Sequence, residues 1–196
     1  MKSYSQAGQD VFVRLILGEN HKGNFIDIGC AGEMYSNTLA LEQEGWTGWL
    51  VDIDPNAGNE RRNPFINRDA TKVNWYAMEL DGDLPNYVDY LSLDVDENSL
   101  AALKNLPLDR VRFGIITIEH DAYRFGDKLR PGERAVLMAH GYQLICKDVC
   151  GAPGAPFEDW WVSPGLVEKA AKFATREPKL YTDILKAVEI PSADSP

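Results

Sequence analysis

The amino-acid sequence predicts an α/β protein built on a doubly wound, mostly parallel β-sheet. Short apolar segments alternate along the chain with helical segments, a pattern typical of a parallel sheet covered by helices. The last two predicted strands follow one another across a turn-rich link at residues 151–156, without a helix between them. They should therefore form an antiparallel hairpin at the edge of the sheet.

Each predicted element has a local signal. In residues 5–17 the apolar side chains fall on one helical face, and residues 25–29 form the short apolar run expected of a strand buried on both faces. Ser36 is a suitable N-cap for a helix over residues 36–44, and Gly45 suits a left-handed C-cap. The same criteria predict seven strands, at residues 25–29, 48–53, 73–78, 88–93, 111–118, 141–149 and 157–162, and further helices at residues 99–106, 130–140 and beyond Pro164.

The charge of the chain restricts its partners. Thirty acidic and 20 basic residues give a formal net charge of −10 over 196 residues. A surface this acidic repels nucleic-acid backbones and anionic lipids, so we expect neither nucleic acid nor a membrane as partner. The minor alternative is a local basic cleft, for which the chain offers one tight cluster: Arg61, Arg62 and Arg68.

Location follows from what the sequence lacks. No apolar run approaches the roughly 18 residues needed to span a bilayer. The N-terminal residues lack the apolar core of a secretory signal. Cys30, Cys146 and Cys150 are an odd set without metal-type spacing, as in proteins of a reducing compartment. We therefore expect a cytoplasmic protein.

Two strand ends mark a candidate ligand site. Asp27 and Gly29 end the first strand, at the carboxyl edge where open α/β sheets bind ligands. The second strand ends at Asp52 and Ile53, and an acid there can accept two hydrogen bonds from a ribose diol. The first loop has neither a dinucleotide fingerprint nor a phosphate loop, and its Glu33 would repel a diphosphate. The residues favour a phosphate-free, positively charged nucleoside such as S-adenosylmethionine.

A second group of titratable residues follows the fourth and fifth strands: Asp94, Asp96, Glu119, His120 and Asp121. Parallel strands end at the same edge, so these groups should crowd one cleft, although Glu119 and His120 point in opposite directions unless the strand has already ended. His120 or Asp94 would suit a general base for methyl transfer to a hydroxyl. The carboxylates could instead hold Mg²⁺ or Mn²⁺, or form surface ion pairs. We assign no metal ligand.

Eight different short motifs follow one another within residues 4–164: SQxGQD at 5–10, FIDIG at 25–29, SNT at 36–38, GWxG at 45–48, LSLDVD at 91–96, IEHD at 118–121, GY at 141–142 and FEDW at 157–160. This ordered set resembles the FkbM-type methyltransferases, within the class I S-adenosylmethionine-dependent superfamily. The resemblance implies one domain over residues 1–196, with a Rossmann-like, seven-stranded core at about residues 4–164 and a helical extension at 165–196. The chain departs from the superfamily at the glycine loop, which reads GCAGE rather than GxGxG.

The resemblance also implies roles for single residues. Asp27 and Gly29 would lie along the methionine moiety of the cofactor, Asp52 would accept the ribose hydroxyls, and Ile53 would pack on the adenine.

Four further residues are expected beside the cofactor. Gln9 and Asp10 would meet its amino or carboxylate end, or would simply belong to a capped amphipathic helix. Asn37, from the SNT motif, is also assigned there. Cys30 lies next to the glycine turn, where we favour a small buried residue over a functional thiol.

The implied activity is methyl transfer to the hydroxyl oxygen of a saccharide or small molecule. Asp94, Asp96, Glu119 and His120 are the candidate catalytic residues. The short chain has no large insertion to enclose an acceptor, so we expect an open acceptor site. A partner subunit of a homo-oligomer could complete it. A rival hypothesis is a non-catalytic domain of the same fold that binds a nucleoside or a protein, which the degenerate glycine loop favours. A nicotinamide-dependent oxidoreductase is a third.

Overall fold

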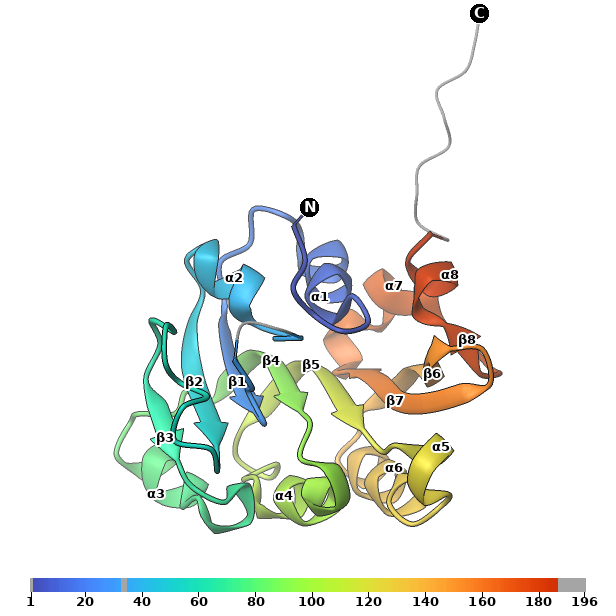
Figure 1. Ribbon diagram of the computed structural model, residues 1–196. Helices are drawn as coiled ribbons and strands as arrows, with labels where there is room; N and C mark the ends of the chain where they lie inside the picture. Colours follow the sequence, from blue (N-terminus) through green and yellow to red (C-terminus); the bar gives the residue numbers. More distant parts are fainter. Residues whose placement is uncertain (1, 33–34, 187–196) are drawn as a thin grey trace, which may run out of the picture.

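An eight-stranded sheet forms the centre of the molecule (Figure 1). The computed structural model describes residues 2–32 and 35–186. Within them the strands lie in the order β3-β2-β1-β4-β5-β7-β6-β8. Their bounds are β1 Asn24–Ile28, β2 Thr47–Asp52, β3 Phe65–Asn67, β4 Tyr87–Leu93, β5 Arg112–Glu119, β6 Gln143–Ala152, β7 Ala155–Val162 and β8 Lys179–Leu180.

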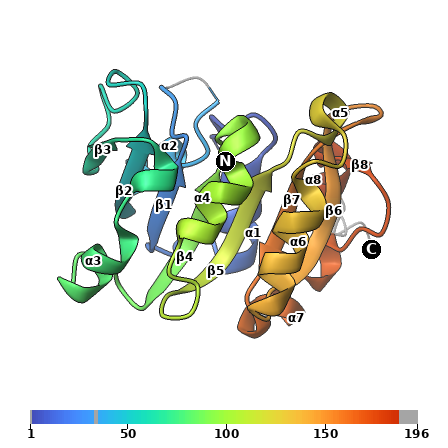
Figure 2. The same cartoon turned by 90° about the horizontal axis from the view of Figure 1, so that it is seen from below.

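Helices cover both faces of the sheet. The α-helices are α1 Gln9–Leu17, α2 Leu39–Gln43, α3 Trp75–Leu80, α4 Ser99–Asn105, α5 Ala122–Phe125, α6 Arg130–Ala139, α7 Val167–Ala170 and α8 Tyr181–Lys186. Figure 1 places α1, α2, α7 and α8 on one side of the sheet, and Figure 2 views the other side, where α3, α4 and α6 lie. In the described parts of the chain, no helix combines the length and apolar character that a membrane span requires.

The period-two alternation of the strands divides the core into two layers. Phe25, Tyr90 and Trp160 pack in the layer beneath α1. Their chain neighbours Ile26 and Trp161 pack in the opposite layer, with residues of α4 and α6. Successive strand residues point to opposite faces, so central strands buried on both sides read as continuous apolar runs. This burial explains why the central strands were predictable.

The predicted topology is confirmed in its main features. Strands β1, β2, β4 and β5 pair in parallel, and β6 and β7 form the antiparallel hairpin. Strand β7 also pairs antiparallel with β5. The φ of Gly45 is 95°, as a left-handed helix end requires.

The number of strands differs from the prediction of seven. Residues Lys179–Leu180 form β8, which pairs in parallel with β6, so the hairpin is not the last element of the sheet. The extension after residue 164 therefore contains a strand as well as helices. Residues 187–196 of that extension lie outside the described residues.

The strand predicted at residues 73–78 was wrong. Most of that segment lies in α3, because the Asn74 side chain accepts the Ala77 N–H and caps a helix whose first residue, Trp75, is fully buried. The third strand in the chain is β3, only three residues long. A run this short gives no usable periodicity.

Candidate active site

A pocket of about 690 Å³ opens at the carboxyl ends of β1, β2 and β4. Its lining includes Gly29 and Ala31 after β1, Asp52 and Ile53 at β2, and Asp94 after β4. This volume lies in the range of small-molecule sites, and the position is the edge where open α/β sheets bind ligands. The structure thus brings together the residues predicted at the ends of three separate strands.

Gly29 brings the first loop close to the end of β4. Its φ is 80°, and a Cβ built there would overlap the carbonyl oxygen of Asp94. The surrounding backbone is held by hydrogen bonds from the Gly29 N–H to Val51 O (2.8 Å) and from the Asp94 N–H to Ile28 O (2.9 Å). Only glycine fits this position, because it has no side chain and tolerates positive φ.

Asp52 is oriented by two backbone amides. Its Oδ2 accepts the Ala31 N–H at 3.2 Å, and its Oδ1 accepts the Asp54 N–H at 2.9 Å. A carboxylate has about four acceptor positions, so this half-exposed group keeps capacity for two further donors. Beside it, Ile53 is 74% exposed and offers an apolar surface to the pocket. Both residues predicted at the end of the second strand therefore line the pocket, and their roles toward a ribose and an adenine stay predictions.

Asp27 and Asn37 belong to a buried polar network next to the pocket and are not part of its lining. Thr38 Oγ1 donates to Asp27 Oδ2 at 2.5 Å, and Arg61 Nη2 donates to Thr38 Oγ1 at 2.8 Å. Burial raises the pKa of Asp27 to about 6, against the lowering effect of Thr38 and Arg61. Asn37 donates to Ser92 Oγ at 3.0 Å, and its own Oδ1 has no partner among the described residues.

Asp94 and Glu119 form a carboxyl pair. The last paired residues of β4 and β5 are Leu93 and Ile118, so the two acids follow side by side. Glu119 lies within hydrogen-bonding reach of Asp94 and of Asp121. Burial, with Asp94 next in effect, raises the pKa of Glu119 far above its usual range, and burial also raises the pKa of Asp94. Two neighbouring carboxylates in a buried position repel each other when both are charged, which favours protonation of one of them.

Asp96 lies on the outer flank of the pocket. It is exposed, has a φ of 48° and pairs with Arg124 at 3.1 Å. Its carboxylate is therefore engaged by a surface ion pair.

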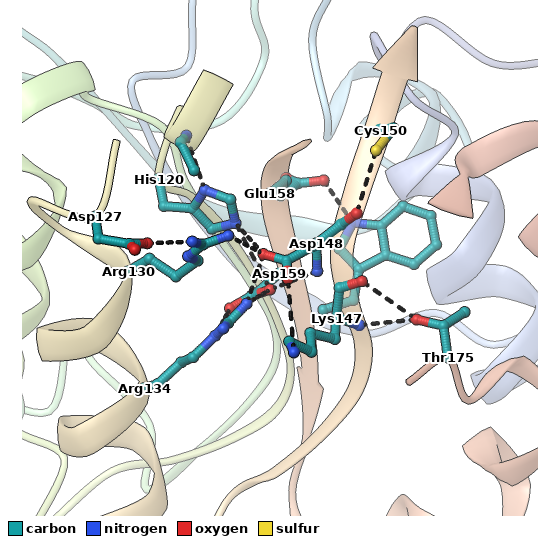
Figure 3. A network of polar contacts seen from close by, with 12 residues as sticks. His120, Asp127, Arg130, Arg134, Lys147, Asp148, Cys150, Glu158, Asp159 and Thr175 are labelled. Atoms are coloured by element: carbon teal, nitrogen blue, oxygen red, sulfur yellow. Dashed lines mark hydrogen bonds and ion pairs between the residues drawn. The ribbon is translucent and has the colours of Figure 1, made fainter. Parts of the chain in front are cut away.

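His120 is not part of the pocket lining and belongs to a buried polar network (Figure 3). Its Nδ1 accepts the Ala122 N–H at 3.1 Å, and its Nε2 lies 3.6 Å from one oxygen each of Asp148 and Asp159. Arg134 bonds to both of these carboxylates, at 2.7 and 2.8 Å. His120 is fully buried, so we do not assign the general base to it.

The same residues contain the one metal-like group found within the described part of the chain. Ligand atoms of His120, Asp148 and Asp159 lie within 4.8 Å of one another. The Nδ1 of the histidine accepts a hydrogen bond, so its proton is on Nε2, where a metal would need a lone pair. Arg130 and Arg134 already neutralise the carboxylates. This arrangement fits an ion-pair network better than a metal centre.

Gln9 and Asp10 are held by protein partners. The side-chain amide of Gln9 donates to Glu158 at 3.1 Å. Asp10 accepts hydrogen bonds from the hydroxyls of Ser3 and Ser5, each at 2.7 Å. Both residues are buried and lie outside the pocket lining, so they act here in fixing the N-terminal segment on α1.

Cys30 is a buried free thiol whose pKa is raised, chiefly by burial. It matches the favoured interpretation of a small packing residue. Glu33, whose charge entered the argument against a diphosphate, lies outside the described residues.

Asp69 also belongs to the site and was not predicted from the sequence. It follows β3 and lines the pocket, with its carboxylate held by the Thr71 N–H at 2.9 Å and the Thr71 hydroxyl at 2.7 Å. These hydrogen bonds lower the pKa of Asp69 to about 2. An acid just after a third strand could have identified this residue from the sequence. It was overlooked because the third strand was predicted at residues 73–78 instead of at β3.

No protein-family model and no curated protein sequence matches the chain. Solved structures do resemble it. Magnesium protoporphyrin IX methyltransferase (ChlM) from Synechocystis PCC 6803, with bound S-adenosylmethionine, aligns with a TM-score of 0.55 at 16% identity, over 81% of this chain and 79% of that one. An O-methyltransferase from Bacillus cereus, in complex with S-adenosylhomocysteine, aligns with a TM-score of 0.54 at 17% identity, over 79% of this chain and 80% of that one.

The chain has a class I methyltransferase fold. At such low identities the likeness establishes the fold, and activity has to be argued from the site. In this methyltransferase fold both Asp52 and Asp94 line the pocket, and Glu119 lies beside Asp94.

Proposed function

We propose that the protein is an S-adenosylmethionine-dependent methyltransferase of the FkbM type that methylates a hydroxyl on a saccharide or small molecule. The observation that supports it most strongly is the amide-oriented carboxylate of Asp52 beside exposed Ile53, in a pocket at the strand ends. A ribose diol matches the free acceptor positions of Asp52, and an adenine ring matches the apolar surface of Ile53. The two structural neighbours contain S-adenosylmethionine or S-adenosylhomocysteine, which supports the same ligand class.

The charge of the pocket supports a cationic ligand. Its lining contains five acids, Asp52, Asp69, Asp94, Asp96 and Glu97, against two arginines, Arg68 and Arg124. One arginine, Arg124, is already paired with Asp96. Such a lining attracts a sulfonium and repels a diphosphate. It therefore favours S-adenosylmethionine over a nicotinamide dinucleotide.

The residues at the strand ends suit methyl transfer to oxygen. When bound, S-adenosylmethionine supplies the methyl group, and a neutral thioether leaves as the new O–CH₃ bond forms. The acceptor hydroxyl must lose its proton, and the Asp94–Glu119 pair offers the carboxylate to receive it. The backbone around Gly29 and Asp52 would fix the position of the bound cofactor. For an in-line displacement, this orientation contributes more to the rate than removal of the proton.

Replacing Asp52 with alanine is expected to weaken S-adenosylmethionine binding by about 1–3 kcal/mol, the scale of losing a charged hydrogen-bond acceptor. Isothermal titration calorimetry measures this change. Asp54→Ala is the matched control, because Asp54 is the neighbouring exposed acid and lies outside the pocket lining. If the two variants bound S-adenosylmethionine with equal affinity, Asp52 would not be the residue that binds the ribose.

A non-catalytic domain that binds a nucleoside or a protein is the second candidate. The observation in its favour is the irregular loop after β1, where non-glycine Ala31 has a φ of 47°. Incubation with S-adenosylmethionine and a panel of saccharides and small alcohols, followed by mass spectrometry, separates the two. A gain of one methyl group supports the enzyme, whereas cofactor binding without any methylated product supports the binding domain.

The acceptor site and the location are part of the same proposal. The pocket is open, which suits an acceptor reached from solvent or a site completed by a second copy of the chain. All three cysteines are buried free thiols, which supports a reducing, cytoplasmic environment.

A further inference from the structure

The Asp94–Glu119 pair occupies an unusual position, between the pocket and the buried side of the sheet. Asp94 lines the pocket, and Glu119 lies beside it at the end of β5. Across the antiparallel pairing with β7, Glu119 is opposite Glu158. The pair can thus respond to a ligand in the pocket while it remains partly shielded from water.

The groups around the pair provide little compensating positive charge. Those that face it from the neighbouring elements are Asp27 on β1, Asp52 on β2, Asp96 after β4, Asp121 and Tyr123 after β5, and Glu158 on β7. The neighbouring cation, Arg124, lies 3.1 Å from Asp96 and 3.8 Å from Asp121. A bare double charge on the pair would therefore be costly.

A carboxylate oxygen of Asp121, next to the pair, also lacks a hydrogen-bond donor among the described residues. Its side chain is buried and lies within hydrogen-bonding reach of Glu119, yet its Oδ1 has no partner among the described residues. Buried carboxylate oxygens normally have a hydrogen-bond donor. By contrast, the oxygens of Glu158 accept hydrogen bonds from Gln9 and Trp160.

We propose that the Asp94–Glu119 pair holds one proton in the free protein and releases it when S-adenosylmethionine binds, so that the cationic cofactor takes the place of the proton. This inference rests on the proposed function. S-adenosylmethionine carries a net positive charge at neutral pH, whereas S-adenosylhomocysteine, which lacks the sulfonium, carries none. The demethylated product therefore lets the pair keep a proton.

The exchange also closes the proton balance of the reaction. Cofactor binding leaves the pair as two carboxylates. During transfer the S–CH₃ bond breaks, the O–CH₃ bond forms, and the hydroxyl proton moves to the pair. The pair is then protonated again beside a neutral product, which no longer needs two negative charges next to it.

The pH dependence follows from the sign of this exchange. Because the bound state holds fewer protons than the free state, raising the pH favours binding of S-adenosylmethionine. With one full proton released, the Kd should fall about tenfold per pH unit below the pKa of the pair, and the Kd for S-adenosylhomocysteine should change much less. Burial raises the pKa of Glu119, so this window extends above the pH range in which an ordinary glutamate titrates.

Calorimetric titration of the full chain at pH 7, in two buffers of different ionisation enthalpy, counts the protons released. We expect close to one proton per S-adenosylmethionine bound, a smaller number for S-adenosylhomocysteine, and almost none for Glu119→Gln with S-adenosylmethionine. Glu158→Gln is the matched control, since burial raises the pKa of that acid to about 8 and it faces the same pair. It should release as many protons as the parent chain, and circular dichroism checks that both variants are folded.

The outcomes separate this inference from the proposed function. If S-adenosylmethionine does not bind, the proposed function fails. If it binds without proton release, or with equal release for S-adenosylhomocysteine, the exchange is overturned and the proposed function stands. Loss of the release in Glu158→Gln but not in Glu119→Gln would also overturn the assignment to the Asp94–Glu119 pair.

Discussion

Replacing Gly29 with alanine is expected to destabilise the protein by about 2–5 kcal/mol and to abolish binding of S-adenosylmethionine. The loss of stability is the sum of two costs. A left-handed backbone costs an ordinary L-residue about 1–2 kcal/mol, and Gly29 has a φ of 80°. Overpacking costs about 1–3 kcal/mol more, because the new Cβ would overlap the carbonyl oxygen of Asp94. That carbonyl cannot easily move, since the Asp94 N–H is bonded to Ile28 O.

Urea denaturation gives the change in stability, and calorimetry gives the change in affinity. Gly32→Ala is the control in the same loop, because a Cβ at Gly32 would meet nothing within 4 Å. Its effect on stability should stay within about 0.5 kcal/mol. If Gly29→Ala matched this control in stability and affinity, the close approach of the loop to β4 would be needed neither for folding nor for cofactor binding.

Replacing Arg134 with methionine is expected to destabilise the protein by about 3–5 kcal/mol, the cost of removing one partner from buried ion pairs. Arg134 makes hydrogen bonds of 2.7 and 2.8 Å to Asp159 and one of 2.7 Å to Asp148. Both carboxylates are buried, and Asp159 is only 1% exposed. Methionine keeps the apolar stem of the side chain, so the loss comes from the uncompensated charge.

The control for this change is Arg124→Met. Arg124 and Asp96 are 57% and 69% exposed, and an exposed pair contributes no more than about 1 kcal/mol. The deficit of Arg134→Met should also shrink in acid. Against the raising effect of burial, the nearby His120 ring and the Arg134 guanidinium lower the pKa of Asp159, so its contribution is present above its unfolded pKa, about 3.9, and is lost as the pH falls below that value. Urea denaturation at several pH values checks both expectations, and a small, pH-independent deficit would contradict them.

The central strands were predictable because the packing that buries them also shapes their sequence. Strands β1, β2, β4 and β5 lie between two helix layers, so each is a recognisable apolar run. Strand β3, with three residues, and β8, with two, were not predictable. Their pairing depends on neighbours distant in the sequence, and so few residues cannot show a period.

The site was predictable to the extent that topology determines it. Parallel strands end at one edge, and this places Asp52 and Asp94 at the same pocket. The alternation of side chains also anticipated that Glu119 and His120 would face different ways. The partners of His120 could not be foreseen, because Arg134, Asp148 and Asp159 are far along the chain and meet only through the bulged β6–β7 hairpin and α6.

A crystal structure of the protein soaked with S-adenosylmethionine would show directly whether Asp52 binds the ribose. We expect the ribose hydroxyls within hydrogen-bonding distance of the Asp52 carboxylate, the adenine against Ile53, and the sulfonium on the Asp94 side of the pocket. A ligand bound at another surface, or a pocket whose side chains leave no room for the ribose, would contradict this expectation.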